Sequence, residues 1–499
     1  MPFAIGIDVG TTNTKAALFG LPSCNPIHIE RMPSPRIIAG DNTDYDIRAL
    51  VRGIMDMLSS CVASAGEYAR EIEFVSIASV GESGVLVRSD GTYSDKSIFW
   101  YDNRGESYAE EAISSGYSST LYRITGIPTH SNSTLFKILW MREHGANLQG
   151  ATWLTMADFV AWLLSGQLAQ DRTLASRTSA YDVLNDRMSV EILDHYGLPR
   201  QLFAPLEESG ASRGRVRSKV SQRTGLPKEC MVCVSGHDHM SGAAVCNLRV
   251  GTEALNSTGT SEGLLLLNAR PSLTDSSMER QITNGRYVET SLFTSYASVP
   301  SAGLSFEWSL KTLGYEPDDY YKESLPKLYE SYLEGEFDDT RVLFVPHLRG
   351  SGPPYRDAGS RALFYGMRDA TDRDELVFAT HSGTTMEFAR LCDCMTDGKG
   401  LGEDVCVKVI GPAARNPLWM QLKADLLGIP FVACDVVEAV SRGAVIVAAR
   451  KNGIDVDPQF STTAYQPSPE RHDILDAGLH ESYIPLCDSI ARFERHHID

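Results

Sequence analysis

The chain contains 499 residues, which is too many for a single hydrophobic core, so we expect two domains or three. Hydrophobic residues make up 42% and charged residues 22%, a composition typical of a soluble globular protein. The formal net charge of −18 argues against nucleic acid or an anionic membrane as a partner, although a local cluster of donors can still bind phosphate. No apolar stretch approaches the length of a membrane span and no basic-then-apolar leader opens the chain, so we expect a cytoplasmic protein.

The first twenty residues predict a β-hairpin with an acid at the end of its first strand. An apolar run ends at Asp8, a Gly-Thr-Thr tip follows at residues 10–12, and a second apolar run begins after Lys15. Backbone N–H groups and threonine hydroxyls at such a tip can face phosphate oxygens. Asp8 would repel a bare phosphate, so we expect a cation between them, and Mg²⁺ is the usual choice. An ordinary hairpin explains the turn alone equally well.

The remainder of the first half alternates helical and strand patterns, which predicts an α/β domain with a mixed sheet. Helices are expected at 46–63, 134–142 and 154–164, strands at 74–80 and 85–87, and an exposed loop at 207–224. An aromatic cluster at 98–101 is followed by Asp102 and Arg104. These two charges could form a surface salt bridge or grip a polar substrate beside an aromatic wall.

A buried strand at 231–235 ends at Asp238, where a helix of small residues begins. Ligands favour the carboxyl ends of strands in α/β sheets, so this acid is well placed for chemistry. The neighbours His237 and His239 raise the question of a transition metal, but the sequence offers no second cluster of ligands. The lone Cys-x-x-Cys at 230–233 is interpreted as buried strand thiols for the same reason.

The second half opens after Val250-Gly251 and repeats the first hairpin at residues 255–263, with a hydroxyl-rich tip around Gly259. Two such hairpins indicate duplicated domains, 1–248 and 249–499, whose tips face one cleft and share a polyphosphate. Further helices are expected around Phe306 and at 372–392, 417–427 and 438–451, and further strands at 342–345, 405–410 and 431–433.

Several blocks, in this order, resemble the FGGY family of carbohydrate kinases. The resemblance covers nearly the whole chain and implies the two-domain actin/hexokinase-like (ribonuclease H-like) fold, with duplicated mixed sheets and a cleft between the domains. The blocks that carry it are 8–15, 98–104, the set Asp158, Gly166, Asp171, Ala175 and Ser176, then 236–238, 257–261, and 411–416 followed by Trp419, Gln421, Ala424 and Asp425.

The resemblance implies ATP and Mg²⁺ as cofactors and a role for each matching residue. Asp238 would be the general base, because a carboxylate can take the proton of a sugar hydroxyl as that oxygen bonds to phosphorus. Substrate contacts would come from Glu82, Ser83, Trp100, Asp102, Arg104 and His239. Nucleotide contacts would come from Gly10, Thr11, Thr12, Asn13, Lys15, Gly259, Thr260, Ser261, Gly303, Gly411, Pro412, Ala413 and Asn416, and the metal would lie near Asp8 and Asp238. Pro412 and Ala413 stand where the family commonly has glycines, and proline offers no N–H to a nucleotide.

Residues 81–84 (Gly-Glu-Ser-Gly) match neither the Gln-Met-His-Gly of xylulose kinases nor the Gln-Arg-Glu-Thr of glycerol kinases. We expect phosphorylation of a small neutral sugar, with a ketose such as a pentulose first and a short polyol or a deoxy-ketose second. A sugar acid is disfavoured because its carboxylate would meet Glu82, Asp102 and Asp238. An actin-like ATP-driven binding protein and a sugar sensor without turnover are the alternatives. Beyond the sugar we expect no nucleic-acid or membrane partner, and a homodimer is consistent with the chain.

Overall fold

Each half of the chain builds one mixed β-sheet around a central strand. In the computed structural model, which describes residues 2–497, the first sheet has the strand order β14-β15-β6-β1-β2-β3. Strand β1 pairs antiparallel with β2 and parallel with β6, so the hairpin lies on one side and the crossover strands on the other. The six strands are β1 (Phe3–Val9), β2 (Asn13–Gly20), β3 (Asn25–Pro33), β6 (Ile72–Ser79), β14 (Ser212–Arg215) and β15 (Met231–His237).

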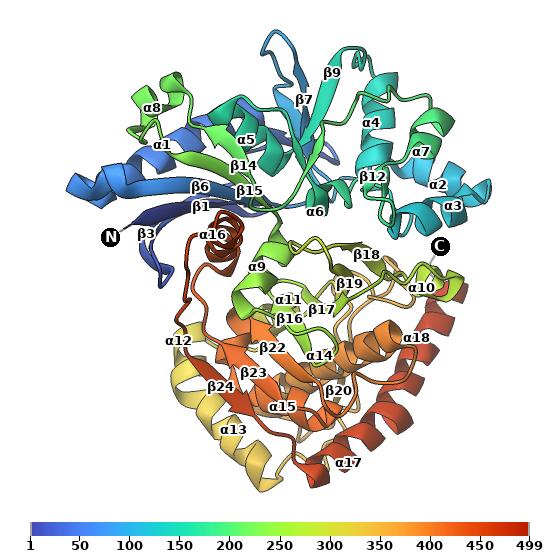
Figure 1. Ribbon diagram of the computed structural model, residues 1–499. Helices are drawn as coiled ribbons and strands as arrows, with labels where there is room; N and C mark the ends of the chain where they lie inside the picture. Colours follow the sequence, from blue (N-terminus) through green and yellow to red (C-terminus); the bar gives the residue numbers. More distant parts are fainter. Residues whose placement is uncertain (1, 498–499) are drawn as a thin grey trace.

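The second sheet repeats this arrangement and has the order β18-β19-β17-β16-β22-β23-β24. Here β16 pairs antiparallel with β17 and parallel with β22, as β1 does with β2 and β6. The duplicated mixed sheets expected for the actin/hexokinase-like fold are therefore confirmed, and Figure 1 shows the two halves one above the other. The seven strands are β16 (Glu253–Thr258), β17 (Glu262–Asn268), β18 (Thr283–Arg286), β19 (Phe293–Val299), β22 (Cys406–Ile410), β23 (Phe431–Cys434) and β24 (Thr462–Tyr465).

Helices pack against both sheets. The helices of the first half are α1 (Ile47–Ala65), α2 (Glu106–Ser114), α3 (Tyr117–Thr125), α4 (Thr134–Glu143), α5 (Met156–Ser165), α6 (Arg172–Ala175), α7 (Val190–His195), α8 (Ser218–Thr224) and α9 (Asp238–Cys246). Those of the second half are α10 (Asp275–Glu279), α11 (Gly303–Thr312), α12 (Pro317–Asp319), α13 (Leu325–Glu334), α14 (Arg373–Thr396), α15 (Pro417–Leu427), α16 (Ala439–Lys451), α17 (Pro469–Gly478) and α18 (Ile484–His497).

The short strands pair with one another outside the two large sheets. They are β4 (Arg36–Ala39), β5 (Asn42–Asp46) and β8 (Lys96–Ile98), then β7 (Gly84–Arg88) with β9 (Ala151–Thr155), β10 (Gln170–Asp171) with β13 (Leu206–Glu207), β11 (Tyr181–Asp182) with β12 (Arg187–Met188), and β20 (Leu343–Val345) with β21 (Leu363–Tyr365). None of the helices in the described part of the chain is both long and apolar enough to cross a membrane.

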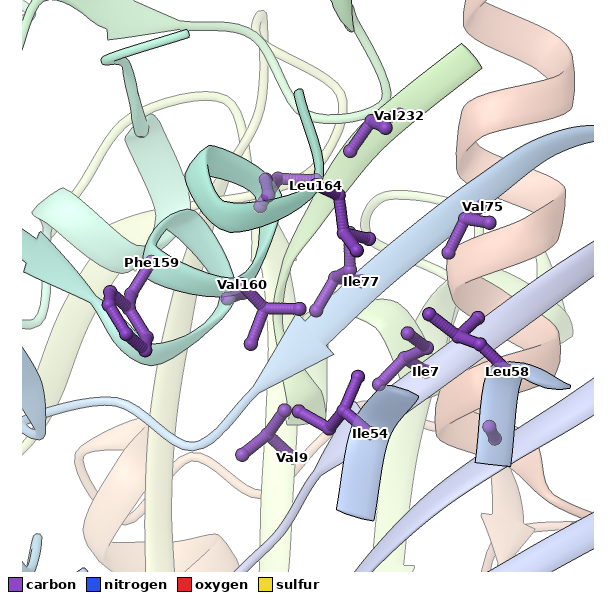
Figure 2. Close-up of a cluster of buried hydrophobic side chains, with 14 of the residues drawn as sticks. Ile7, Val9, Ile54, Leu58, Val75, Ile77, Phe159, Val160, Leu164 and Val232 are labelled. Carbon is purple, nitrogen blue, oxygen red and sulfur yellow. The ribbon is translucent and has the colours of Figure 1, made fainter. Parts of the chain in front are cut away.

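The core of the first half lies between its sheet and two helices, α1 and α5. Figure 2 shows side chains of β1, β6 and β15, among them Ile7, Ile77 and Val232, close to side chains from α1 and α5. Helix α1 begins where Asp46 caps it, because the Asp46 carboxylate accepts a hydrogen bond from the Ala49 N–H at 2.9 Å. Each fully buried aliphatic side chain contributes about 1.5–3 kcal/mol, so this layer fixes β1 and hence the hairpin tip at its end.

Helix α16 comes from the second half of the chain but packs on the sheet of the first half. Figure 1 shows it beside β1, apart from the other late helices. A Cβ on Gly6 of β1 would lie 2.1 Å from the Ser441 carbonyl oxygen, and one on Gly443 would lie 1.7 Å from that of Ser241 in α9. Glycine at both positions permits this close approach. Helix α16, which lies within the range 249–499 expected for the second domain, therefore packs against the sheet of the first half.

Two predictions about local structure are wrong. The expected exposed loop at 207–224 contains an edge strand, β14, and a helix, α8. The apolar pattern does not predict this strand, because an edge strand can be rich in polar residues. One of them, Arg213, is buried in the structure, with a guanidinium nitrogen 3.7 Å from the Asp158 carboxylate. The expected helix at 154–164 begins at Met156, since Leu154 belongs to β9, which pairs with β7.

Candidate active site

A cavity of about 270 Å³ lies between the two halves and receives both hairpin tips. Thr11 of the first tip and Ser261 of the second tip line it, together with Asp238 at the start of α9. Its wall further includes Glu82, Trp100, His130, Arg177, His239, Tyr296 and Arg356. A larger cavity of about 580 Å³ in the second half contains neither tip, so the smaller one is the candidate active site.

The first tip, between β1 and β2, is held by side chains from the loops around it. The Gly10 carbonyl oxygen accepts hydrogen bonds from the Ser34 hydroxyl at 2.7 Å and from the Tyr45 hydroxyl at 3.2 Å. The indole Nε1 of Trp100 donates to the Thr11 hydroxyl at 2.8 Å. This last bond joins the tip to the cavity wall, because Trp100 lines the cavity too.

The other residues expected to bind nucleotide at this tip lie around it. Thr12 is exposed and Asn13 is half-buried at the start of β2. Lys15 pairs with Glu438 at 3.1 Å, next to α16. The side chain of Lys15 thus points toward the start of α16, the helix of the second half that packs on the first sheet.

The second tip, between β16 and β17, is held by backbone contacts. The Gly303 N–H donates to the Gly259 carbonyl oxygen at 3.1 Å, and a Cβ on Gly303 would lie 2.1 Å from that same oxygen. Gly411 has φ +100° and its Cβ would lie 2.0 Å from the Thr258 carbonyl oxygen. Only glycine fits such approaches, and they bring the start of α11 and the turn at 411–416 against the tip.

The structure therefore brings most of the expected nucleotide residues of the second half together. Thr260 and Ser261 are exposed at the tip, and the Ala413 N–H donates to the Thr258 hydroxyl at 3.2 Å. Pro412 starts the short helical turn 412–415. Asn416 differs, because it is buried, caps α15 through the Trp419 N–H at 3.0 Å, and contacts His381 at 2.9 Å.

Asp238 lines the cavity, and Asp8, near the end of β1, is close enough for the two carboxylates to interact by charge. Burial raises the pKa of each to about 7, and for Asp8 the charge of Asp238 is the next largest cause. One oxygen of Asp8, Oδ1, is buried without a hydrogen-bond partner among the described residues. Mg²⁺ is usually held by one or two carboxylates together with phosphate oxygens and water, so this orphaned oxygen and its neighbour fit that ion.

Residues 2–497 contain no group of three or more His, Cys, Asp or Glu side chains that could hold a metal ion. His237 and His239 are instead neutral by environment, because burial lowers the pKa of both, that of His239 to about 4. The Asp238 carboxylate accepts from the His239 N–H at 2.7 Å, which fixes its orientation.

Glu82 reaches the cavity from the turn before β7, in a left-handed conformation with φ +56°. Its carboxylate forms an ion pair with Arg177, whose Nε lies 2.8 Å from Oε1. The buried Lys137 holds this region in place, because its Nζ donates to the carbonyl oxygens of Glu82 at 3.2 Å and of Phe99 and Trp100, each at 2.8 Å. Glu82 and Trp100 therefore lie on the cavity wall as a fixed pair.

Three residues expected to contact substrate do not line the cavity. The Ser83 hydroxyl donates to the Ile98 carbonyl oxygen at 2.9 Å and is buried. Arg104 donates from Nε to Asp102 at 2.9 Å, and Asp102 also accepts from the Thr43 N–H at 2.7 Å. These contacts tie β5 and β8 together, so in this structure the charged pair supports the wall without reaching the cavity.

The cavity residues missed from the sequence include His130, Arg177, Tyr296 and Arg356. Arg177 directly follows Ala175 and Ser176, which belong to the blocks that resemble the family, so its position next to them could have identified it as a candidate. Arg356 lies in the glycine- and proline-rich loop after β20, and nothing in the local pattern distinguishes it from a surface arginine. His130 and Tyr296 enter the site only through tertiary packing.

Comparisons with known proteins identify a family for both halves. The model for the N-terminal domain of the FGGY family of carbohydrate kinases matches residues 3–246, and that for the C-terminal domain of the same family matches residues 254–451. A xylulose kinase of Bacillus subtilis (strain 168) is 24% identical over 458 residues, covering 91% of this chain and 89% of that relative. A glycerol kinase of Dechloromonas aromatica (strain RCB) is 26% identical over 513 residues, covering 96% of each. The solved structure of a gluconate kinase from Lactobacillus acidophilus has the same fold, with a TM-score of 0.86, 20% identity and 99% coverage of both chains.

Proposed function

The chain belongs to the FGGY family of carbohydrate kinases, and on that basis we propose that its cavity transfers the γ-phosphate of ATP to a hydroxyl of a small sugar. The observation that carries this proposal is the convergence of both hairpin tips and Asp238 on one cavity. The tips present small residues and hydroxyls, the groups that suit a polyphosphate. An alcohol bound against Asp238 would lie beside the last phosphate.

Asp238 is proposed as the general base. Its carboxylate accepts the proton of the substrate hydroxyl while the hydroxyl oxygen forms a bond to the γ-phosphorus. The bond from that phosphorus to the oxygen bridging the β- and γ-phosphates breaks, and ADP leaves. The backbone N–H of His239 donates a hydrogen bond to the Asp238 carboxylate at 2.7 Å and holds it in position. The side chain of Asp238 is 22% exposed, so a ligand can reach it. Asp8 and Asp238 would hold Mg²⁺, which when bound supplies neutralisation of the phosphate charge.

The substrate fills the rest of the cavity, between Asp238 and the wall formed by Glu82, Trp100 and His239. A volume of about 270 Å³ suits a sugar of a few carbons, including the ketose or short polyol that the sequence favoured. The argument against a sugar acid loses two of its three carboxylates, because Glu82 is neutralised by Arg177 and Asp102 lies outside the cavity, which leaves Asp238. The relatives are named for a ketose, a triol and a sugar acid, so their names do not choose among these classes.

The experiment is a coupled assay of ADP release with a panel of ketoses, polyols and aldonates, in the presence of Mg²⁺. We expect ADP release to require one class of sugar, and Asp238→Asn to lower kcat by about 10²–10⁴-fold while sugar binding persists by calorimetry. ATP hydrolysis that is independent of every sugar would favour the actin-like alternative. Sugar binding without any ADP release would favour the sensor.

A further inference from the structure

Arg356 reaches the cavity from the second half of the chain and contacts the first half there. It lies in the loop between β20 and β21 with φ +44°, and its N–H donates to the Gly352 carbonyl oxygen at 2.9 Å. Its guanidinium Nη1 lies 3.1 Å from the ring Nε2 of His130, which stands between α3 and α4. Both side chains line the cavity, so this contact spans it between the two halves.

The charges around Arg356 do not balance. The other cavity arginine, Arg177, is paired with Glu82. Within the described part of the chain, Arg356 has no ion pair, and its one polar side-chain contact is with His130. Burial, followed by the charges of Arg356 and Arg177, lowers the pKa of His130 to about 3, so this imidazole is neutral and accepts the hydrogen bond. A sheltered cation without an anion is costly, and a ligand with negative charge would remove that cost.

The free edge of the guanidinium has the shape that a carboxylate needs. Nη1 is used by His130, whereas Nε is buried and has no hydrogen-bond partner among residues 2–497. Nε and the neighbouring Nη2 form one side of the planar guanidinium, and two parallel N–H donors on that side bind a carboxylate through both of its oxygens. His130 therefore orients the guanidinium and leaves this edge to a ligand.

The guanidinium and the proposed base belong to one cavity. Asp238 and Arg356 both line it, and the charges of both act on the Tyr296 hydroxyl, which lines it too. A ligand that spans the cavity would thus have one end at Asp238 and the other at Arg356. We infer that the substrate is a sugar acid of the aldonate type, whose carboxylate binds the Nε edge of Arg356 while a hydroxyl at its other end faces Asp238. This inference rests on the proposed kinase function and names its substrate class.

Matched pairs of substrates test the inference, because an aldonate and its alditol differ only in a carboxylate against a CH₂OH group. We would measure kcat/KM by ADP release for gluconate against glucitol and xylonate against xylitol, with xylulose and ribose 5-phosphate as further arms. The wild-type protein should prefer one aldonate over its alditol. Arg356→Gln should lower kcat/KM for that aldonate by roughly 10- to 150-fold and that for the alditol by less than about 3-fold.

Two further variants guard the interpretation. Arg356→Lys keeps the charge but loses the planar edge, so its kcat/KM for the aldonate should fall between those of the wild type and Arg356→Gln. Arg368→Gln removes the same charge from an exposed site in the same half and should change neither substrate. Thermal unfolding of each variant shows whether it is folded.

The inference is overturned if an alditol, a ketose or the sugar phosphate is the best substrate, or if Arg356→Gln weakens aldonate and alditol equally. Failure of the proposed function gives a different result, namely no sugar-dependent ADP release with any compound. In that case calorimetric titration of gluconate and xylonate into the wild type and Arg356→Gln still decides the point. Binding lost on substitution supports the carboxylate site, and the absence of any binding contradicts it.

Discussion

The two hairpin tips occupy equivalent places in two similar sheets, but the structure holds them in different ways. Side chains of Ser34, Tyr45 and Trp100 grip the first tip, whereas the second tip is fixed by the close backbone approach of Gly303 and Gly411. Contacts of the first kind can be removed one hydrogen bond at a time. The contacts at Gly303 and Gly411 tolerate no larger residue, because any Cβ at these positions would collide with a carbonyl oxygen.

The tips also differ in charge. Asp8 stands two residues before the tip glycine Gly10, and Ser257 stands two residues before Gly259. The carboxylate and its orphaned oxygen therefore belong to the first tip alone. We therefore propose that the two tips have different roles: the first would supply a metal ligand and is joined to the cavity wall through Trp100, and the second lies against the turn at 411–416, where nucleotide contacts are expected.

The largest effect should come from adding a methyl group to the turn that packs against the second tip. Gly411→Ala places a Cβ 2.0 Å from the Thr258 carbonyl oxygen at φ +100°, so we expect a loss of about 2–5 kcal/mol of unfolding free energy. Gly259→Ala is the matched control, because its Cβ would meet only the Ser261 carbonyl oxygen at 3.8 Å. Urea unfolding of both variants measures the difference, and equal stabilities would contradict the glycine account.

The acid at the first tip should make stability depend on pH. Asp8 has a folded pKa of about 7 and an ordinary value of 3.8, so the folded protein retains a proton between these pH values that the unfolded chain has lost. Stability from this group is therefore present at low pH and is lost as pH rises through 7. In metal-free protein, Asp8→Asn should stabilise more at pH 8 than at pH 5, by about 2 kcal/mol.

Ser257→Ala, at the equivalent place in the second tip, is the control for this experiment. It should show no such dependence between pH 5 and pH 8, because it changes no titrating group. Thermal unfolding with a chelator present measures both variants. A pH-independent effect of Asp8→Asn would contradict the burial of a proton-binding carboxyl at the first tip.

The smallest effect should come from loosening the first tip. Trp100→Phe removes the 2.8 Å hydrogen bond to the Thr11 hydroxyl and keeps most of the aromatic wall, so kcat/KM should fall roughly 2- to 10-fold. Trp308→Phe, at a tryptophan that is 37% exposed, should leave kcat/KM unchanged. A loss greater than 100-fold in Trp100→Phe would show that the first tip is as intolerant as the second.

Local pattern carried most of what the sequence could predict. Both hairpins, the helices at α1, α14, α15 and α16, and the acid at the start of α9 follow from apolar spacing interrupted by glycine, threonine or aspartate. The contribution of α16 to the first sheet could not be predicted, because it depends on Gly6 meeting Ser441 across more than four hundred residues. Likewise, Asp102 and Arg104 were assigned to the substrate, but their partners Thr43 and Asp44 lie on a strand that the pattern did not reveal.

The cavity arginines show a second limit of sequence reasoning. Whether an arginine can bind an anionic ligand depends on whether a carboxylate of the protein already pairs with it. Arg177 pairs with Glu82, whereas Arg356 has no such partner among the described residues, and only the three-dimensional structure shows this difference. Counting carboxylates along the chain led to a preference for a neutral sugar. The folded cavity pairs Glu82 with Arg177 and adds Arg356, which has no ion pair among the described residues, so carboxylates counted along the chain do not exclude an anionic substrate.

The central claim is that both tips bind one nucleotide across the cavity, and amide hydrogen exchange tests it most directly. Exchange would be followed in the segments 8–15 and 257–261, with and without Mg²⁺ and ADP, with the α17 segment as an internal reference. The account predicts that the nucleotide slows exchange in both segments together and leaves α17 unchanged. Protection of only one tip, or of neither, would contradict it.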